Sequence, residues 1–316
     1  MSNKQVVFID SVHPVLEQKL TQAGMRCLDQ TKTNFENLLP FLSTAYGIVI
    51  RSRFTIDANF LSFCPNLKFI ARSGSGLENI DTKSCRELGI RIYNSPEGNR
   101  NAVAEHALGM LLSLFHKIQK ADKEIRVGEW NRESNRGEEL DGKTVGIIGY
   151  GNNGAAFAKK LRGFDVRVLA YDKYKSGFGD HFVQECTLNA IMEQSDVLSF
   201  HIPQNKETRF IFNNDFISKM HKPFYVLNLS RGKIVETEAL VSGLKTGKIK
   251  GAGLDVLEFE SKSFESFFEQ ELPPSFSYLI SADNVVLTPH VGGWTTESYF
   301  KLSSVLADKI LADEIN

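Results

Sequence analysis

Three glycines suggest the first piece of chemistry in this chain. Gly149, Gly151 and Gly154 follow an apolar, strand-like run, and a helix-like stretch begins near Asn152 and Asn153. Glycines at this spacing allow a tight turn, a close approach of the main chain to a pyrophosphate, and close packing of a helix on a strand. The amides of the first helical turn would then point at the phosphates. The pattern predicts a dinucleotide-binding turn, with an ordinary strand-to-helix turn as the alternative.

An acidic residue favours one dinucleotide over another. Asp172 ends the next strand-like run, and its distance from Gly154 along the chain is close to that expected of a ribose-binding acid. A carboxylate there accepts hydrogen bonds from two ribose hydroxyls and repels a 2′-phosphate, so NAD is favoured over NADP as the cofactor. Lys173, the next residue, carries the opposite charge and leaves that selectivity open.

Redox chemistry on an alcohol or a ketone also needs a cation that polarises the substrate and a group that exchanges a proton. Arg231 follows an apolar run, which places it at the carboxyl end of a sheet strand, where ligands of parallel sheets bind. His290 follows Pro289 and precedes a valine and two glycines, and histidine exchanges protons near neutral pH because its ordinary pKa is about 6.5. Glu260 is the candidate carboxylate that would fix the tautomer of this histidine. A surface arginine and a structural histidine are the alternatives.

These residues belong to an alternating pattern of strand-like and helix-like segments. Strands at residues 5–9, 46–50 and 67–71 and a helix at 14–23 predict a first, smaller α/β domain. From about residue 103 to 291, strands and helices alternate around the glycine turn, as a doubly wound parallel sheet requires. We also expect a linker at 93–101, a long helix at 103–118, an irregular segment at 258–280, and a closing helix at 297–310 that packs on the first domain.

Composition limits the class of protein. The 316 residues correspond to about two domains, and 37 basic against 38 acidic residues give a formal net charge of −1. Without a basic run, neither nucleic acid nor an anionic membrane surface is expected as a partner. The N-terminus does not resemble a leader and no apolar stretch reaches membrane-spanning length, so a cytoplasmic protein is expected. The four cysteines are scattered packing residues without metal-site spacing, and no metal is expected.

The order of the motifs resembles the family of D-isomer-specific 2-hydroxyacid dehydrogenases. The resemblance rests on the glycine turn with Asp172, on Arg231-Gly232, on the Gly-Leu-Asp-Val sequence around Asp255 and on Thr288-Pro289-His290, and it covers nearly the whole chain. It implies an α/β fold with two doubly wound parallel-sheet domains. A Rossmann NAD-binding domain would occupy residues 99–292, and a smaller, flavodoxin-like substrate-binding domain would occupy residues 1–98 and 293–316. It further implies a homodimeric enzyme that acts on a small 2-hydroxy or 2-oxo acid.

The resemblance also assigns roles to individual residues. The catalytic set would be Arg231, Glu260 and His290. The cofactor would contact Gly149, Gly151, Asn152, Asn153, Gly154, Asp172, His201, Pro203 and Asp255, and Asp255 resembles the residue that meets the nicotinamide amide. The substrate carboxylate would lie in a loop whose glycines let main-chain amides approach an anion, formed by Arg72, Ser73, Gly74, Ser75 and Gly76.

One departure from the family pattern concerns the glutamate. The family usually has a proline after it and a shorter run to the histidine, whereas here Ser261 follows Glu260 and the run to His290 is longer. Glu271 preserves the usual distance to the histidine and is the alternative partner. Glu260 is preferred because its spacing from Arg231 is similar to the family pattern.

Three arginines resemble those with which phosphoglycerate dehydrogenases meet the substrate phosphate. These are Arg51, Arg72 and Arg132, and a dianionic phosphate rewards converging guanidinium groups. They favour oxidation of 3-phosphoglycerate to 3-phosphohydroxypyruvate, as in serine biosynthesis, although pairing with surface acids is the alternative. Because the chain ends at residue 316, a C-terminal regulatory domain is not expected. The alternative functions are a glyoxylate or hydroxypyruvate reductase and, from another class, a non-catalytic NAD-sensing module.

Overall fold

The computed structural model describes residues 4–260 and 273–314. The described chain forms two compact units, one of residues 4–99 and 294–314 and one of residues 100–260 and 273–293. Each unit is built on one sheet in which all strands are parallel, with apolar cores on both of its faces. The predicted fold class, two doubly wound parallel-sheet domains, is confirmed.

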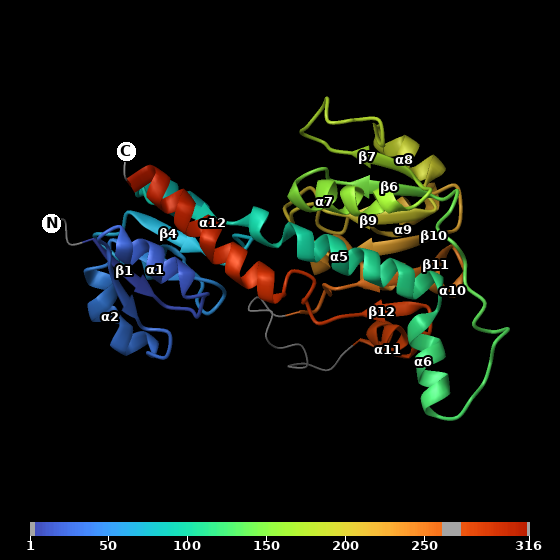
Figure 1. Cartoon of the computed structure of the whole chain (residues 1–316), viewed down its shortest axis with the longest axis horizontal. Coiled ribbons are helices and arrows are strands. Elements are labelled where there is room, and N and C mark those ends of the chain that lie inside the picture. Colours follow the sequence, from blue (N-terminus) through green and yellow to red (C-terminus); the bar gives the residue numbers. More distant parts are fainter. Residues whose placement is uncertain (1–3, 261–272, 315–316) are drawn as a thin grey trace. The chain divides into compact units, whose positions relative to one another are not determined.

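The smaller unit has a five-stranded sheet of order β2-β1-β3-β4-β5, which is the flavodoxin-like order. Its strands are β1 (Gln5–Phe8), β2 (Arg26–Asp29), β3 (Gly47–Ile50), β4 (Phe69–Arg72) and β5 (Arg91–Asn94). Its helices are α1 (Val15–Gln22), α2 (Phe35–Ser43), α3 (Ala58–Ser62), α4 (Thr82–Glu87) and α12 (Thr296–Glu314). Helix α12 returns from the end of the chain and packs against α1, as Figure 1 shows for the red C-terminal helix.

The larger unit has a seven-stranded sheet of order β12-β11-β10-β9-β6-β7-β8. Its strands are β6 (Thr144–Ile148), β7 (Arg167–Tyr171), β8 (Val183–Glu185), β9 (Val197–Phe200), β10 (Phe224–Asn228), β11 (Ile249–Leu254) and β12 (Val285–Leu287). Its helices are α6 (Ile118–Arg126), α7 (Asn152–Lys160), α8 (Leu188–Gln194), α9 (Asn214–Lys219), α10 (Thr237–Lys245) and α11 (Pro274–Ser281), with short 3₁₀ helices at Leu161–Gly163 and Gly232–Ile234. Helix α5 (Pro96–Phe115) begins in the smaller unit and continues into the larger one. The strand order is that of a Rossmann domain with one added strand, and its direction reverses between β6 and β9.

The sequence of the central strands follows from burial on both faces of the sheet. In β10, Phe224 and Val226 belong to one core and Tyr225 and Leu227 to the other. A strand that is covered on both sides is apolar along its whole length rather than at alternate positions. This explains why the strands of this unit appear in the sequence as uninterrupted apolar runs.

Two expectations about connecting segments need correction. Residues 93–101 do contain the junction of the two units, after Asn99, but they are not an irregular linker, because β5 extends to Asn94 and α5 begins at Pro96, which suits the first turn of a helix. Gly98 serves close packing, since a Cβ there would lie 2.7 Å from the Cα of Leu302 in α12. In the segment expected to be irregular, residues 274–281 form helix α11, while residues 261–272 lie outside the described part of the chain.

Within residues 4–260 and 273–314, no helix has the length and apolar character that a bilayer span needs. No group of histidine, cysteine and acidic side chains in the same residues is arranged to hold a metal ion.

Candidate active site

Most of the predicted residues of the larger unit follow the carboxyl ends of its parallel strands, which meet at one edge of the sheet. Ligands of open α/β sheets bind at this edge, at the point where the strand order reverses. The glycine turn follows β6, Asp172 follows β7, His201 follows β9, Arg231 follows β10, Asp255 follows β11 and His290 follows β12. The fold therefore brings segments that are distant in the sequence to a single edge.

The glycine turn has two glycines that the fold requires and one that leaves space for a ligand. Gly149 has a φ of +93°, and a Cβ at Gly154 would lie 2.0 Å from the carbonyl oxygen of Gly149. Around Gly151, by contrast, no other atom lies within 4 Å of the position that a Cβ would take. Gly151 is the N-cap of α7 and supplies no capping side chain, so the first amides of the helix are available to an anion.

The two asparagines that follow differ in their contacts. The side-chain oxygen of Asn152 is 3.5 Å from Nη1 of Arg100, whereas the Oδ1 atom of Asn153 is buried without a hydrogen bond to any described residue. An open glycine, uncapped helical amides and an unpaired buried oxygen fit the phosphates and ribose of a dinucleotide.

Asp172 is held in place by main-chain amides. Its Oδ2 accepts a hydrogen bond from the amide of Tyr150 at 2.8 Å, and its Oδ1 accepts from Tyr174 at 2.9 Å and Lys175 at 3.1 Å. A carboxylate offers about four acceptor positions, so one remains for a ribose hydroxyl. The carboxylate is thus oriented before any ligand binds.

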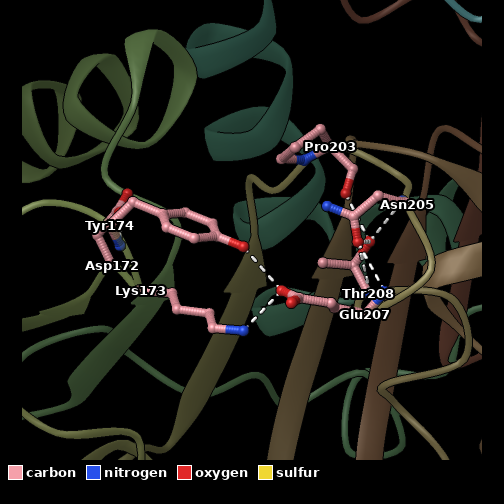
Figure 2. Close-up of polar contacts among 7 residues, drawn as sticks. All are labelled: Asp172, Lys173, Tyr174, Pro203, Asn205, Glu207 and Thr208. Atoms are coloured by element: carbon pink, nitrogen blue, oxygen red, sulfur yellow. Dashed lines mark hydrogen bonds and ion pairs between the residues drawn. The ribbon is translucent and has the colours of Figure 1, made fainter.

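The charge of Lys173 is neutralised by a residue that the sequence patterns did not single out. The ammonium nitrogen of Lys173 lies 2.6 Å from Oε2 of Glu207, and the hydroxyl of Tyr174 donates to the same oxygen at 2.7 Å (Figure 2). These hydrogen bonds lower the pKa of Glu207 and raise those of Lys173 and Tyr174. Asn205 fixes the turn that carries Glu207 by accepting from its amide at 2.8 Å. A 2′-phosphate beside Asp172 would therefore meet a lysine that already has an acidic partner.

His201 and Pro203 lie in the loop after β9, but the imidazole of His201 is turned into the protein. Its Nε2 is 2.8 Å from the hydroxyl of Ser199, and its ring packs 5.5 Å from that of Phe157, centre to centre. Burial lowers the pKa of His201 to about 4, so the ring is neutral at physiological pH. A contact of His201 with a dinucleotide would have to come from its main chain, since its carbonyl oxygen lies beside Gly149.

The loop that carries Arg231 is fixed by Asn228, the last residue of β10. This fully buried side chain accepts from the amide and the hydroxyl of Ser230 at 3.1 and 2.8 Å and donates to the carbonyl of Arg231 at 2.9 Å. Nη1 of Arg231 in turn donates to the carbonyl of Ser230 at 2.6 Å. Gly232 must be a glycine, because a Cβ there would lie 1.9 Å from the carbonyl oxygen of Leu257.

His290 and Glu260 are in contact. Nδ1 of His290 lies 3.1 Å from Oε2 of Glu260, and both side chains are largely buried. The other candidate partner, Glu271, lies outside the described residues. His290 also has a φ of +56°, a left-handed conformation that a side chain disfavours.

Asp255 holds the loop on which His290 lies. Its buried carboxylate accepts from the hydroxyl of Thr288 at 2.6 Å and from the amides of Val291 and Gly292 at 2.8 Å each. A Cβ at Gly292 would lie 2.8 Å from the same carboxylate. Three protein donors thus occupy Asp255, and its expected contact with the nicotinamide amide stays a prediction.

In the smaller unit, Arg51 and Arg72 lie at the same edge of the sheet, because Arg72 pairs in register with Ile50 at the ends of β4 and β3. The guanidinium of Arg51 stacks 4.2 Å from the centre of the Trp294 ring. Nη1 of Arg72 occupies the space beside Gly74, 1.7 Å from the position that a Cβ would take if residue 74 had a side chain.

The loop after Arg72 has free main-chain donors. Ser73 donates to the carbonyl of Ile50 at 2.9 Å, but the amides of Gly74, Ser75 and Gly76 make no hydrogen bond to any of the described residues. The loop is tied down elsewhere, since the side chain of Asn94 donates to the carbonyl of Ser75 at 2.7 Å. Successive free amides of this kind form an anion-binding concavity.

Arg132 does not belong to the same unit as these two arginines. It belongs to the larger unit, in the exposed stretch between α6 and β6. It makes no hydrogen bond or ion pair with any residue of the described part of the chain. Its convergence with Arg51 and Arg72 on one phosphate stays a prediction.

The sequence analysis predicted no role for several residues that shape this site. Asn228 and Thr288 are polar residues at the ends of buried strands, and that position is a usable signal. Glu207 lies in an Asn-x-Glu turn on the surface and had no such signal.

Comparison with known proteins adds independent findings. Residues 108–292 match the family model described as D-isomer specific 2-hydroxyacid dehydrogenase, NAD binding domain. The chain is 34% identical to a hydroxypyruvate reductase of Thermotoga maritima, over 96% of this chain and 97% of that protein. It is also 34% identical to a D-3-phosphoglycerate dehydrogenase of Archaeoglobus fulgidus, over 91% of this chain but only 53% of that protein. Its structure is similar to that of a D-lactate dehydrogenase from Aquifex aeolicus complexed with NAD and lactic acid, with a TM-score of 0.82 and 26% identity over 98% of this chain and 95% of the other.

Proposed function

This chain belongs to the family of D-isomer specific 2-hydroxyacid dehydrogenases, and we propose that within this family it oxidises 3-phosphoglycerate to 3-phosphohydroxypyruvate. What is common to the family holds for the chain: it is an NAD-dependent oxidoreductase that acts on CH–OH groups, and residues 108–292 are part of its NAD-binding domain. The substrate within the family is the part that we propose. Serine biosynthesis and a homodimeric assembly are included in the proposal.

The observation that carries the proposal is the set of anion-binding groups at one edge of the five-stranded sheet. Arg51 follows β3, Arg72 ends the neighbouring strand β4, and three free amides follow Arg72. A 2-hydroxy acid with a phosphate group has two anionic ends, and amide nests and guanidinium groups suit such ends. We therefore propose that residues 1–98 and 293–316 bind the substrate.

The contacts of His290 support a role in proton transfer. NAD, when bound, supplies the acceptor for the hydride that leaves C2 of the substrate. The contact of Glu260 with Nδ1 of His290 favours the tautomer with its proton on Nδ1, which leaves Nε2 to accept the proton of the 2-hydroxyl group. Glu260 then stabilises the resulting imidazolium. Arg231 offers a guanidinium that holds the carboxylate and polarises the C2 oxygen.

A second candidate function is reduction of hydroxypyruvate or glyoxylate. It is supported by the Thermotoga hydroxypyruvate reductase, which the chain matches over nearly its full length, whereas it matches only about half of the Archaeoglobus phosphoglycerate dehydrogenase. The third candidate, a non-catalytic NAD sensor, is disfavoured by the arginine, glutamate and histidine that the chain retains.

Steady-state assays at 340 nm test the proposal. The purified protein is assayed with NAD and 3-phosphoglycerate, and with NADH and 3-phosphohydroxypyruvate, hydroxypyruvate or glyoxylate. We expect the largest kcat/KM for the phosphorylated pair. A larger kcat/KM for hydroxypyruvate or glyoxylate would assign the second candidate function. NAD binding without turnover of any of these acids would leave only the third candidate, the non-catalytic NAD sensor.

A further inference from the structure

The hydrogen bonds around Asp255 extend to a residue that is outside the proposed catalytic set. Nε2 of His106, on helix α5, lies 2.9 Å from the hydroxyl oxygen of Thr288 and 3.7 Å from Oδ1 of Asp255. The hydroxyl of Thr288 is itself 2.6 Å from the same Oδ1. His106, Thr288 and Asp255 thus form a continuous chain within the larger unit.

The direction of these hydrogen bonds follows from counting protons. The hydroxyl of Thr288 has one proton, and the Asp255 carboxylate accepts it because it has none to give. The Thr288 oxygen can then only accept from His106, so Nε2 of His106 carries a proton and is the donor. Each member of the chain has one arrangement that satisfies its neighbours.

At its other end, this series of hydrogen bonds reaches the main chain on both sides of His290. The carboxylate of Asp255 accepts from the amides of Val291 and Gly292, and its carbonyl oxygen accepts from the amide of His290 at 2.7 Å. His290 has a φ of +56°, which is unfavourable for a residue with a side chain and persists only where its surroundings impose it. Asp255 is the residue that imposes it.

The His106 end of the hydrogen-bond series is anchored by a helix that is buried in the core. Ala104, Ala107 and Met110 of α5 are buried in one of the cores of the larger unit, on the helix that also carries His106. Helix α5 approaches β11 closely at Gly253, where a Cβ would lie 3.3 Å from the Cβ of Met110. His106 is therefore fixed relative to Asp255, which follows the same strand.

We propose that His106 is a positioning residue of the reaction. It donates to Thr288, Thr288 donates to Asp255, and Asp255 holds His290 in the strained conformation from which its imidazole meets the substrate. This inference rests on the proposed role of His290 in proton transfer. Its consequence is that loss of the His106 donor lowers kcat, because the position of His290 relaxes, while the binding of NADH and of the 2-oxo acid is unchanged.

Substitutions at residue 106 separate the donor from the bulk of the side chain. His106→Phe keeps a ring and removes the donor, whereas His106→Gln places an amide nitrogen near the position of Nε2 and keeps it. His116→Phe, at an exposed histidine just beyond the end of α5, is the matched control. We expect His106→Phe to lower kcat about tenfold, since one hydrogen bond is lost, with KM and the Kd of NADH within about twofold. His106→Gln should recover most of kcat, and His116→Phe should behave as the wild type.

Two results would overturn the inference. One is a kcat of His106→Phe within twofold of the wild type, and the other is an equal loss of kcat in His106→Gln and His106→Phe. If His106→Phe does not fold, Thr288→Val and Thr288→Ser provide the same comparison, between a variant without the hydrogen-bond donor and one that keeps it, at the next residue of the hydrogen-bond series. Thr288→Ser keeps the hydroxyl and should keep kcat, and equal kcat values for the two variants would refute the proposal.

The proposed role of His290 is tested separately with His290→Asn. If the wild type and His290→Asn are equally active, the proposed function of His290 fails and the inference fails with it. If His290→Asn is inactive while His106→Phe retains full activity, only the inference about His106 fails.

Discussion

The buried imidazole of His201 makes the stability of the larger unit depend on pH. Burial lowers its pKa to about 4, whereas the value in an unfolded chain is about 6.5. Between these values the unfolded chain binds the proton more readily, so stability rises with pH across this window and is lost as the pH falls from about 6.5 towards 4. Proton binding to His201 in the unfolded chain therefore lowers the free energy of unfolding by about 2 kcal/mol at pH 5 but by only about 0.2 kcal/mol at pH 7.

The variant His201→Gln removes the titration and keeps a hydrogen-bonding group near Ser199. Its unfolding free energy is measured by urea titration followed by circular dichroism at pH 7 and pH 5, beside the wild type and His181→Gln, in which an exposed histidine is replaced. We expect the wild type and His181→Gln to lose about 2 kcal/mol more than His201→Gln between the two pH values. Equal losses in all three proteins would refute the reasoning, because they would mean that His201 is not buried as a neutral ring.

Other predictions concern the substrate, the cofactor and its selectivity. Arg51→Met should lower kcat/KM for 3-phosphohydroxypyruvate by about 30- to 150-fold, as expected for about 2–3 kcal/mol of charge-assisted hydrogen bonds, and change it little for hydroxypyruvate; equal losses for both acids would exclude a phosphate contact. Gly151→Ala should fold with an unchanged melting temperature but bind NADH weakly in a fluorescence titration, because its Cβ meets only open space in the protein. Gly154→Ala should instead lower the melting temperature, because its Cβ meets the carbonyl of Gly149 at 2.0 Å; the opposite ranking would contradict the assignment of the two glycines. Glu207→Gln frees Lys173 and should raise the affinity for NADPH relative to NADH roughly fivefold in direct binding, whereas the exposed Glu193→Gln should not.

Local patterns predicted the α/β class of both parts of the chain and the parallel sheet of the second, because the signals for these features are local. The apolar run of β6 is buried at every position, and the glycine spacing that follows it is dictated by contacts within a few residues, such as that between Gly154 and Gly149. The proline and glycine of residues 96–98 misled because the same residue types serve a helix start and a close helix contact. Their role depended on Leu302, which lies in the last helix of the chain.

The site was predictable in its residue types and less so in its contacts. Arg231, Glu260 and His290 could be named from spacing and resemblance, but the φ of His290 and the clamp of Asp255 depend on loops that meet only in the folded chain. The orientation of the His201 ring depends on which side of the sheet the end of β9 faces, and that is a property of the packed unit. Glu207 gained its importance from Lys173, which belongs to a different loop.

The return of helix α12 to the smaller unit affects how the protein is made. Leu306, Ala307 and Ile310 complete a core that begins with Val6 and Phe8 of β1, which are synthesised long before them. Until the last helix is synthesised, Leu16 and Leu20 of α1 cover only part of that apolar face, while the larger unit can already close around its own sheet. The order of completion should therefore be the reverse of the order of synthesis, and the early strands are the part of the nascent chain most in need of a chaperone.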